Sequence, residues 1–147
     1  MLRVYVAAPY PCADKARAAH RELDAIGIQA TSAWAEEARG QEQLSDAFCE
    51  DQRKLWERNA EMLADSHALL ALSEPAGGGE FFVEIGMAIR SAIPVVWVGT
   101  RRVLSCYSGR VRVLGTLEDA LVVLGRAARL ETTDRTAIRR EIMPSLR

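Results

Sequence analysis

The sequence contains few of the residues from which disulfide frameworks and zinc sites are built. Its 147 residues include two histidines and three cysteines, Cys12, Cys49 and Cys106. The cysteine count is odd, the three lie far apart, and neither a CxxC pair nor a cluster of histidine and cysteine occurs. We therefore expect reduced thiols, as in the cytoplasm, and we predict neither a metal nor another cofactor.

Long apolar runs and an excess of one charge are also missing. No run approaches the ~20 apolar residues of a membrane span, and the N-terminus MLRVYVAAPYP lacks the apolar centre of a signal peptide. The formal net charge is -1, which provides no electrostatic attraction to a nucleic-acid polymer or to an anionic membrane. We expect a cytoplasmic protein with neither of these partners. The net charge does not argue against a small anionic ligand, because local groups hold such ligands.

Short apolar runs alternate with helical patterns along the whole chain. The predicted strands are residues 3–8, 28–34, 67–72, 93–99 and 110–114. The predicted helices are residues 13–27, 43–64, 79–92, 116–128 and 132–147. The strands are apolar on both faces and the connections are short, which is typical of a doubly wound parallel sheet. We predict a single α/β domain over residues 1–147, with a flavodoxin-like or Rossmann-like five-stranded sheet and helices on both faces.

Ligands of such folds bind beyond the carboxyl ends of the strands, where the strand order reverses. The segments expected at this edge are AAPYPCAD, WAEE, SEPAGGGE and GTRR, which follow the first four predicted strands. They make Ala7, Pro9, Tyr10 and Trp34 candidate substrate-binding residues. The alternative for Trp34 is packing in the core, whereas its place at the end of a predicted strand favours a role in lining the pocket.

The stretch SEPAGGGEFFVEIGMAI, residues 73–89, leads from a predicted strand into a predicted helix. Its glycines could present backbone amides to an anion, or they could simply form the turn. The spacing is neither G-x-G-x-x-G nor that of a P-loop. On a helical wheel Glu84 lies about 100° from the centre of the apolar stripe, close to the core. Glu84 is therefore a candidate nucleophile or base, although a carboxylate near a helix N-terminus can also serve only the helix dipole.

Four segments together resemble the nucleoside 2-deoxyribosyltransferase family, which includes the deoxynucleoside 5'-monophosphate N-glycosidases. They are VYVAAPY at residues 4–10, ERNAEMLADSHALLAL at 57–72, SEPAGGGEFFVEIGMAI at 73–89 and IPVVWVGTRR at 93–102. The resemblance covers about the first two thirds of the chain. The VEIG element and the opening strand are its more specific parts.

The resemblance implies a retaining glycosyl transfer without a cofactor. Glu84 matches the family nucleophile, which attacks C1' of a 2-deoxyribosyl group, and Tyr5 matches the tyrosine that orients this glutamate. A second nucleobase or water would then open the glycosyl-enzyme ester. Gly78 and Gly79 would leave room and amides for a 5'-phosphate of the small-molecule substrate. The family also implies a homo-oligomer, for which the long predicted helix at residues 43–64 is a plausible interface.

Two positions depart from the family pattern. Glu57 stands where the family has an aspartate eight residues before Asp65, and Gly78 stands where transferases have an aspartate six residues before Glu84. Glu57 is the candidate for the missing acid, and the loss at Gly78 favours hydrolysis or an altered base preference. Two alternatives stay open. One is a lonely-guy-type riboside 5'-monophosphate phosphoribohydrolase, whose glycine loop is similar to residues 75–84; the other is a non-catalytic nucleotide-binding module.

Overall fold

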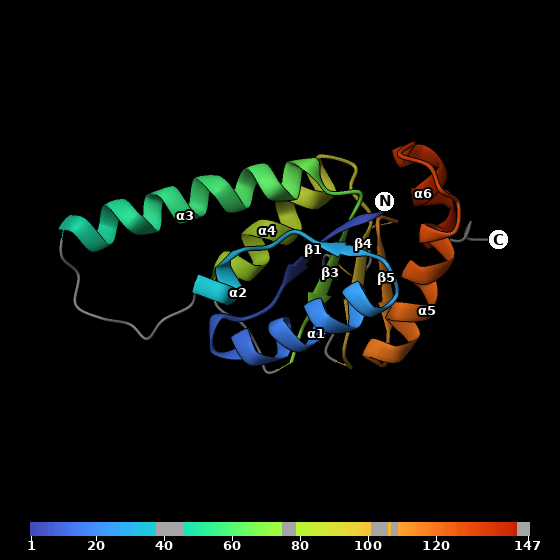
Figure 1. Ribbon diagram of the computed structural model, residues 1–147, viewed down its shortest axis with the longest axis horizontal. Coiled ribbons are helices and arrows are strands. Elements are labelled where there is room, and N and C mark those ends of the chain that lie inside the picture. Colours follow the sequence, from blue (N-terminus) through green and yellow to red (C-terminus); the bar gives the residue numbers. More distant parts are fainter. Residues whose placement is uncertain (38–45, 75–78, 101–105, 107–108, 144–147) are drawn as a thin grey trace.

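The computed structural model describes residues 1–37, 46–74, 79–100, 106 and 109–143. For residues 36–37 and 46–49 it describes the backbone but not the side chains. Its centre is a five-stranded parallel sheet in the order β2-β1-β3-β4-β5 (Figure 1). The strands are β1 Arg3–Ala7, β2 Gln29–Ala30, β3 Ala68–Leu72, β4 Val95–Val98 and β5 Val111–Leu114. The predicted α/β class and the flavodoxin-like strand order are thereby confirmed.

Helices cover both faces of the sheet. They are η1 Tyr10–Cys12, α1 Ala13–Ala25, α2 Trp34–Glu37, α3 Asp46–Asp65, α4 Gly79–Arg90, α5 Leu117–Ala128 and α6 Arg135–Ile142. The chain moves from β1 outward to β2 through α1, but from β3 in the opposite direction to β4 through α4. Because such crossovers are right-handed, α1 and α4 lie on opposite faces. α1 contacts α5, whereas α3 contacts α4 and extends beyond the sheet (Figure 1).

The second strand is much shorter than the sequence predicts. A strand was expected over residues 28–34, but β2 contains only Gln29–Ala30, and Trp34 begins α2. Side chains replace backbone partners on the outer edge of β1: the Val6 N–H donates to Ser32 Oγ at 3.3 Å, and the Trp34 indole N–H donates to the Val6 carbonyl at 3.0 Å. Since these side chains satisfy the polar groups of β1, the neighbouring chain can leave the sheet early.

The other elements follow their predicted ranges to within a few residues, except the last helix. It was predicted over residues 132–147, but α6 contains only Arg135–Ile142, and residues 144–147 lie outside the described part of the chain. Thr116 caps α5, because its hydroxyl accepts a hydrogen bond from the Asp119 N–H at 3.1 Å. β3 is buried along its whole length, and the strands form the centre of the core. Within the described residues no helix has the length and apolar character needed to cross a membrane. The reversal of strand order between β1 and β3 defines the edge at which a ligand site is expected.

Candidate active site

A tyrosine and a glutamate, 79 residues apart, meet at this edge. The Tyr5 hydroxyl, from the middle of β1, donates a hydrogen bond to Glu84 Oε1 at 2.5 Å. Tyr5 is fully buried, and Glu84 is 8% exposed. The structure thus brings together the two residues that the sequence paired as nucleophile and orienting hydroxyl. A hydroxyl that donates to one carboxylate oxygen fixes the direction in which the other oxygen points.

The amphipathic pattern of α4 determines how deeply Glu84 is buried. The buried residues of this helix are Phe81, Glu84, Ile85 and Ala88, which share one face. Phe81 packs against Trp97 of β4, with ring centroids 5.6 Å apart, and this contact anchors the first turn of the helix. Glu84 lies one turn further on, at the border of the apolar face. Glu84 is therefore buried and at the same time lines the cavity described below.

Burial changes the acidity of both partners. Removal from water raises the pKa of the Glu84 carboxyl from its ordinary 4.5 to about 7, and the negative charge of Glu80 adds to this effect. The hydrogen bond from Tyr5 acts in the opposite direction and lowers that pKa. Burial and the neighbouring Glu84 hold the pKa of the Tyr5 hydroxyl well above its usual value. Tyr5 consequently stays protonated and acts as a donor throughout the physiological pH range.

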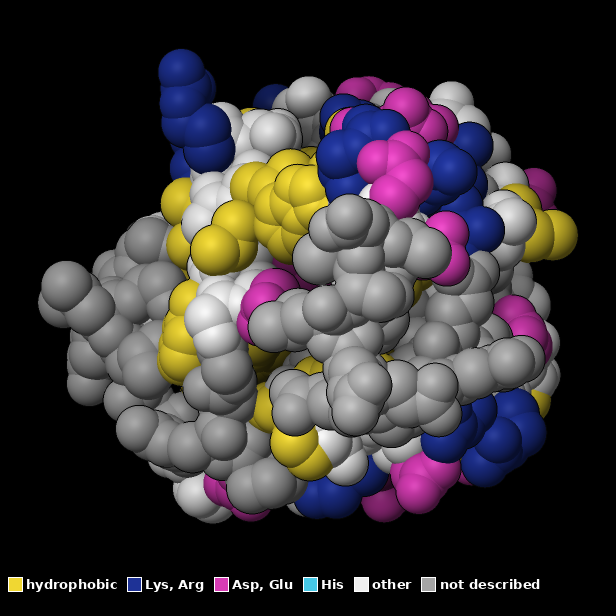
Figure 2. Space-filling view, turned by 90° about the vertical axis from the view of Figure 1, so that its left-hand side faces the viewer, with side chains coloured by type: hydrophobic (Ala, Val, Ile, Leu, Met, Phe, Trp, Pro, Cys, Tyr) yellow, Lys and Arg dark blue, Asp and Glu magenta, His cyan; other side chains and the backbone are white. Residues whose placement is uncertain are grey.

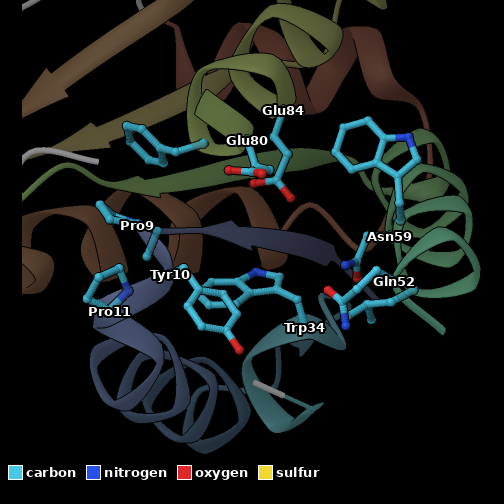
Figure 3. A pocket seen from close by; sticks show the side chains of 12 residues that line it. Pro9, Tyr10, Pro11, Trp34, Gln52, Asn59, Glu80 and Glu84 are labelled. Atoms are coloured by element: carbon cyan, nitrogen blue, oxygen red, sulfur yellow. The ribbon is translucent and has the colours of Figure 1, made fainter. Parts of the chain in front are cut away.

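Glu84 faces a cavity of about 590 Å³, large enough for a nucleoside-sized ligand. Pro9 and Tyr10, which follow β1, and Trp34 from α2 form one side of it (Figure 3). The Trp34 ring is held in place by its bond to β1 and lies at a tilt to Tyr10, with centroids 6.5 Å apart. Two aromatic faces are thus available to stack on a planar ligand. Pro9, Tyr10 and Trp34 were all predicted as substrate-binding residues, and all three line the cavity.

The opposite side of the cavity belongs to α3. Gln52, Leu55, Trp56 and Asn59 line it, and their spacing of three and four residues places them on one helical face. We did not single out these four residues from the sequence. Only Leu55 belonged to the apolar face predicted for this helix, and polar residues such as Gln52 and Asn59 gave no sign of a site wall.

Glu57 does not reach the cavity. Its side chain is 55% exposed and forms an ion pair with Arg53, with 2.5 Å between Oε1 and Nη1. Two positions along a helix correspond to a rotation of about 200°, so Glu57 points away when Asn59 points inward. Asn59 therefore occupies the place in the wall that Glu57 was expected to fill.

The two other predicted contacts near β1 and α4 also lie apart from the cavity surface. Ala7 is fully buried at the end of β1 and is not among the lining residues. Gly79 begins α4 but does not line the cavity either, and Gly78 lies outside the described residues. Glu80, in the first turn of α4, lines the cavity together with Glu84 (Figure 3).

The described lining is acidic on the α4 side and neutral on the α3 side. Glu80 and Glu84 contribute carboxylates, Gln52 and Asn59 contribute amides, and none of the described lining residues is a lysine or arginine. On the face shown in Figure 2, hydrophobic and acidic side chains lie next to one another. Among the described residues no group of three or more histidines, cysteines and carboxylates is placed to hold a metal ion.

Comparison with known proteins places the fold. No protein-family model and no curated protein matches the sequence. Among solved structures, the chain is similar to a 2-deoxyribosyltransferase from the psychrotolerant bacterium Bacillus psychrosaccharolyticus, with a TM-score of 0.59 and 13% sequence identity. The similarity covers 81% of this chain and 90% of that one. The polypeptide therefore has the fold of a 2-deoxyribosyltransferase, with a buried tyrosine–glutamate pair facing a cavity at its ligand edge.

Proposed function

We propose that the protein cleaves the N-glycosidic bond of a 2'-deoxynucleoside or of its 5'-monophosphate, with Glu84 as the nucleophile. The observation that carries this proposal is the buried hydrogen bond between Tyr5 and Glu84 at the wall of a cavity of nucleoside size. Similarity in fold to a 2-deoxyribosyltransferase supports it. Membership of the nucleoside 2-deoxyribosyltransferase family is part of the proposal.

In the first step an ionised Glu84 oxygen attacks C1' of the deoxyribose, and the bond from C1' to the base nitrogen breaks. The electron pair of that bond passes to the base, which takes up a proton. Tyr5 keeps the attacking carboxylate aimed, and the positive charge that develops at C1' is stabilised by the carboxylate itself. The product of this step is a free base and a deoxyribosyl ester of Glu84.

In the second step water or another nucleobase attacks C1' and releases Glu84. The two ionisable side chains that share the described lining with Glu84 are Glu80 and Tyr10. One of these side chains, or a water molecule, donates a proton to the leaving base in the first step. The same group takes a proton from the attacking water or base in the second step. The sequence has glycine at position 78, where transferases have an aspartate, and this difference favours water as the second reactant.

A turnover assay tests the proposal. The protein is incubated with each common deoxynucleoside and deoxynucleoside 5'-monophosphate, with and without a second free base, and release or exchange of the base is followed by chromatography. We expect release from at least one substrate, and mass spectrometry of the quenched enzyme should detect a deoxyribosyl group on the peptide containing Glu84. Nucleosides and monophosphates in parallel decide whether a phosphate is accepted despite the acidic lining.

Glu84→Ala should abolish turnover while the circular dichroism spectrum stays unchanged, and Glu57→Gln serves as the matched control because it replaces an exposed carboxylate on a neighbouring helix. Substantial activity of Glu84→Ala would refute its role as nucleophile. Base release from ribonucleoside monophosphates alone would favour the phosphoribohydrolase, and binding without any turnover would favour the non-catalytic module.

A further inference from the structure

The α3 wall of the cavity contains a buried polar atom that the proposed chemistry does not use. Asn59 is 6% exposed, and its Oδ1 is buried without a hydrogen-bond partner among the residues that the structure describes. The side chain lies in the same cavity as Glu80 and Glu84 (Figure 3). Its neighbour on this wall, Gln52, is by contrast exposed to solvent.

An unpaired buried acceptor destabilises the free protein, because the atom has lost its hydrogen bonds to water and gained none in return. Leucine has nearly the same shape as asparagine and would fill the position without this cost. Buried polar groups in folded proteins are nearly always satisfied, and exceptions call for an explanation. At the wall of a ligand cavity, the simplest explanation is a donor that arrives with the ligand.

We propose that Asn59 Oδ1 accepts a hydrogen bond from an N–H or O–H group of the bound substrate, and that Asn59 is thereby a specificity-determining residue. The inference rests on the proposed function only in taking a deoxynucleoside as the ligand. The terminal torsion of asparagine is soft, so a small rotation turns Oδ1 toward the cavity. Because the amide is neutral, it orients the substrate and does not supply the proton that the leaving base needs.

A deoxynucleoside offers such a donor in two places, the base and the sugar, and 2'-deoxyadenosine separates them well. Its adenine ring carries no N–H, so its donors are the 6-amino group, the 3'-hydroxyl and the 5'-hydroxyl. Purine 2'-deoxyriboside lacks the first, 2',3'-dideoxyadenosine the second and 2',5'-dideoxyadenosine the third. Each analogue therefore deletes one possible partner of Asn59.

Binding of these four ligands is measured by calorimetry in the Glu84→Gln background, which does not consume them, with Asn59 present and with Asn59→Leu. We expect Asn59→Leu to weaken binding of 2'-deoxyadenosine about 10- to 100-fold, since a donor is left unpaired in the complex. One analogue should bind the protein that retains Asn59 more weakly than 2'-deoxyadenosine does. The affinity for that analogue should not fall further when Asn59 is replaced by leucine. That analogue identifies the partner as base or sugar.

The inference is overturned if Asn59→Leu leaves the binding of 2'-deoxyadenosine unchanged, or if it weakens all four ligands equally. Glu57→Gln, on the same helix but outside the cavity, is the control and should affect none of them. Thermal unfolding without ligand adds a second readout: Asn59→Leu should keep or raise Tm, whereas a structural asparagine would lower it. Asn59→Ala, which only shortens the side chain, repeats the test should leucine prevent folding.

The two proposals fail in different ways. Turnover is measured with Glu84 intact. If Asn59→Leu weakens binding as expected but no base is released, the proposed reaction is refuted and the role of Asn59 is retained. If base is released but Asn59→Leu does not affect binding, the role of Asn59 is refuted and the proposed reaction is retained.

Discussion

At the scale of single residues, the burial of Glu84 has a cost in stability. Its pKa in the folded protein, about 7, lies above the ordinary 4.5. Between these two pH values the folded state binds more protons than the unfolded state, so stability falls as pH rises. The favourable contribution is complete below about pH 4.5 and has been lost once pH passes through 7.

Glu84→Gln should therefore stabilise the folded protein at pH 8, where the wild-type carboxylate is charged. A shift from 4.5 to about 7 corresponds to an upper limit of about 3 kcal/mol in the free energy of unfolding, measured by urea denaturation. At pH 4.5 both forms are neutral and the difference should nearly vanish. Equal stability of the two proteins at pH 8 would mean that the carboxylate is better solvated than its 8% exposure indicates.

The same pKa sets the pH dependence of the reaction. A nucleophilic carboxylate has to be ionised, so kcat/KM should rise tenfold per pH unit up to about pH 7 and then level off. Initial rates of base release at low substrate concentration between pH 5 and 9 provide the measurement. A rate that is flat down to pH 5 would contradict the assignment of Glu84.

The rise of kcat/KM with pH, which we call the acid limb of the profile, should be shifted in opposite directions by substitution of two neighbours of Glu84. The hydrogen bond from Tyr5 lowers the pKa of Glu84 and the charge of Glu80 raises it, so Tyr5→Phe should shift the limb to higher pH and Glu80→Gln to lower pH. Tyr5→Phe should also reduce kcat/KM above the limb about 10- to 100-fold, because a charge-assisted hydrogen bond is lost. Glu57→Gln should leave the profile in place.

The sequence revealed these two residues but not the wall that faces them. Glu84 could be found because a carboxylate beside an apolar stripe violates the helical pattern, and Tyr5 was paired with it through the family resemblance. Asn59 could not be found, because a polar residue in a mostly polar helix is unremarkable until the rotation of the helix about its axis is known. The same rotation sends Glu57 into solvent, where it pairs with Arg53.

At the scale of elements, the junctions after the strands depend on local geometry that the hydrophobic pattern does not encode. Residues 28–34 were predicted as a strand, yet hydrogen bonds of the Val6 backbone with the side chains of Ser32 and Trp34 replace the expected ladder. The hydrophobic pattern indicates which side chains are buried. A side chain that forms a hydrogen bond to the backbone of a neighbouring strand is buried just as the side chain of a strand residue is, so the pattern does not distinguish the two. The pattern therefore located the segment correctly and overestimated the length of the strand.

Gly99, directly after β4, is a second such junction. Its φ of 135° is disfavoured for other residues, and a Cβ there would stand 2.2 Å from Ser73 Oγ, which itself donates to the Val98 carbonyl at 2.8 Å. Gly99→Ala should lower the free energy of unfolding by about 2 kcal/mol or more, measured by urea denaturation.

Gly125 is the matched control, because it lies within α5 and a Cβ there would make only an ordinary contact, 3.9 Å from Ile26 Cδ1. Gly125→Ala should raise stability by about 0.5–1 kcal/mol, the usual helix preference of alanine over glycine. If both substitutions had the same effect, the tight junction between β3 and β4 would not be the reason for glycine at position 99.

At the scale of the whole molecule, the described residues place an exposed apolar pair on the outer side of α4. Phe82 is 41% exposed and Val83 48%, next to Glu84 in the sequence, and Trp56 on the neighbouring helix α3 is 39% exposed. The family resemblance implies a homo-oligomer with the helix predicted at residues 43–64 as a plausible interface. We propose that α4 contributes to this contact between copies of the chain together with α3. The organisation of residues 1–147 as one domain is also a prediction from the sequence.

Phe82→Glu should lower the molecular mass measured by light scattering after gel filtration, because a charge would have to be buried at the contact. The control is Val122→Glu, which introduces the same charge at another exposed apolar residue, 52% accessible and located on α5. It should leave the mass unchanged. A wild-type protein that is monomeric at tens of micromolar would refute the proposal.

The separation of Tyr5 from Glu84 also has a consequence during synthesis. The two residues are 79 positions apart, so at ~5–20 residues per second a ribosome needs about 4–16 s to add the glutamate after the tyrosine. The strands that bring them together pair over long stretches of chain, and such pairing is slow compared with helix formation. No nascent chain shorter than the completed β1–β3–α4 unit can therefore form the hydrogen bond between Tyr5 and Glu84.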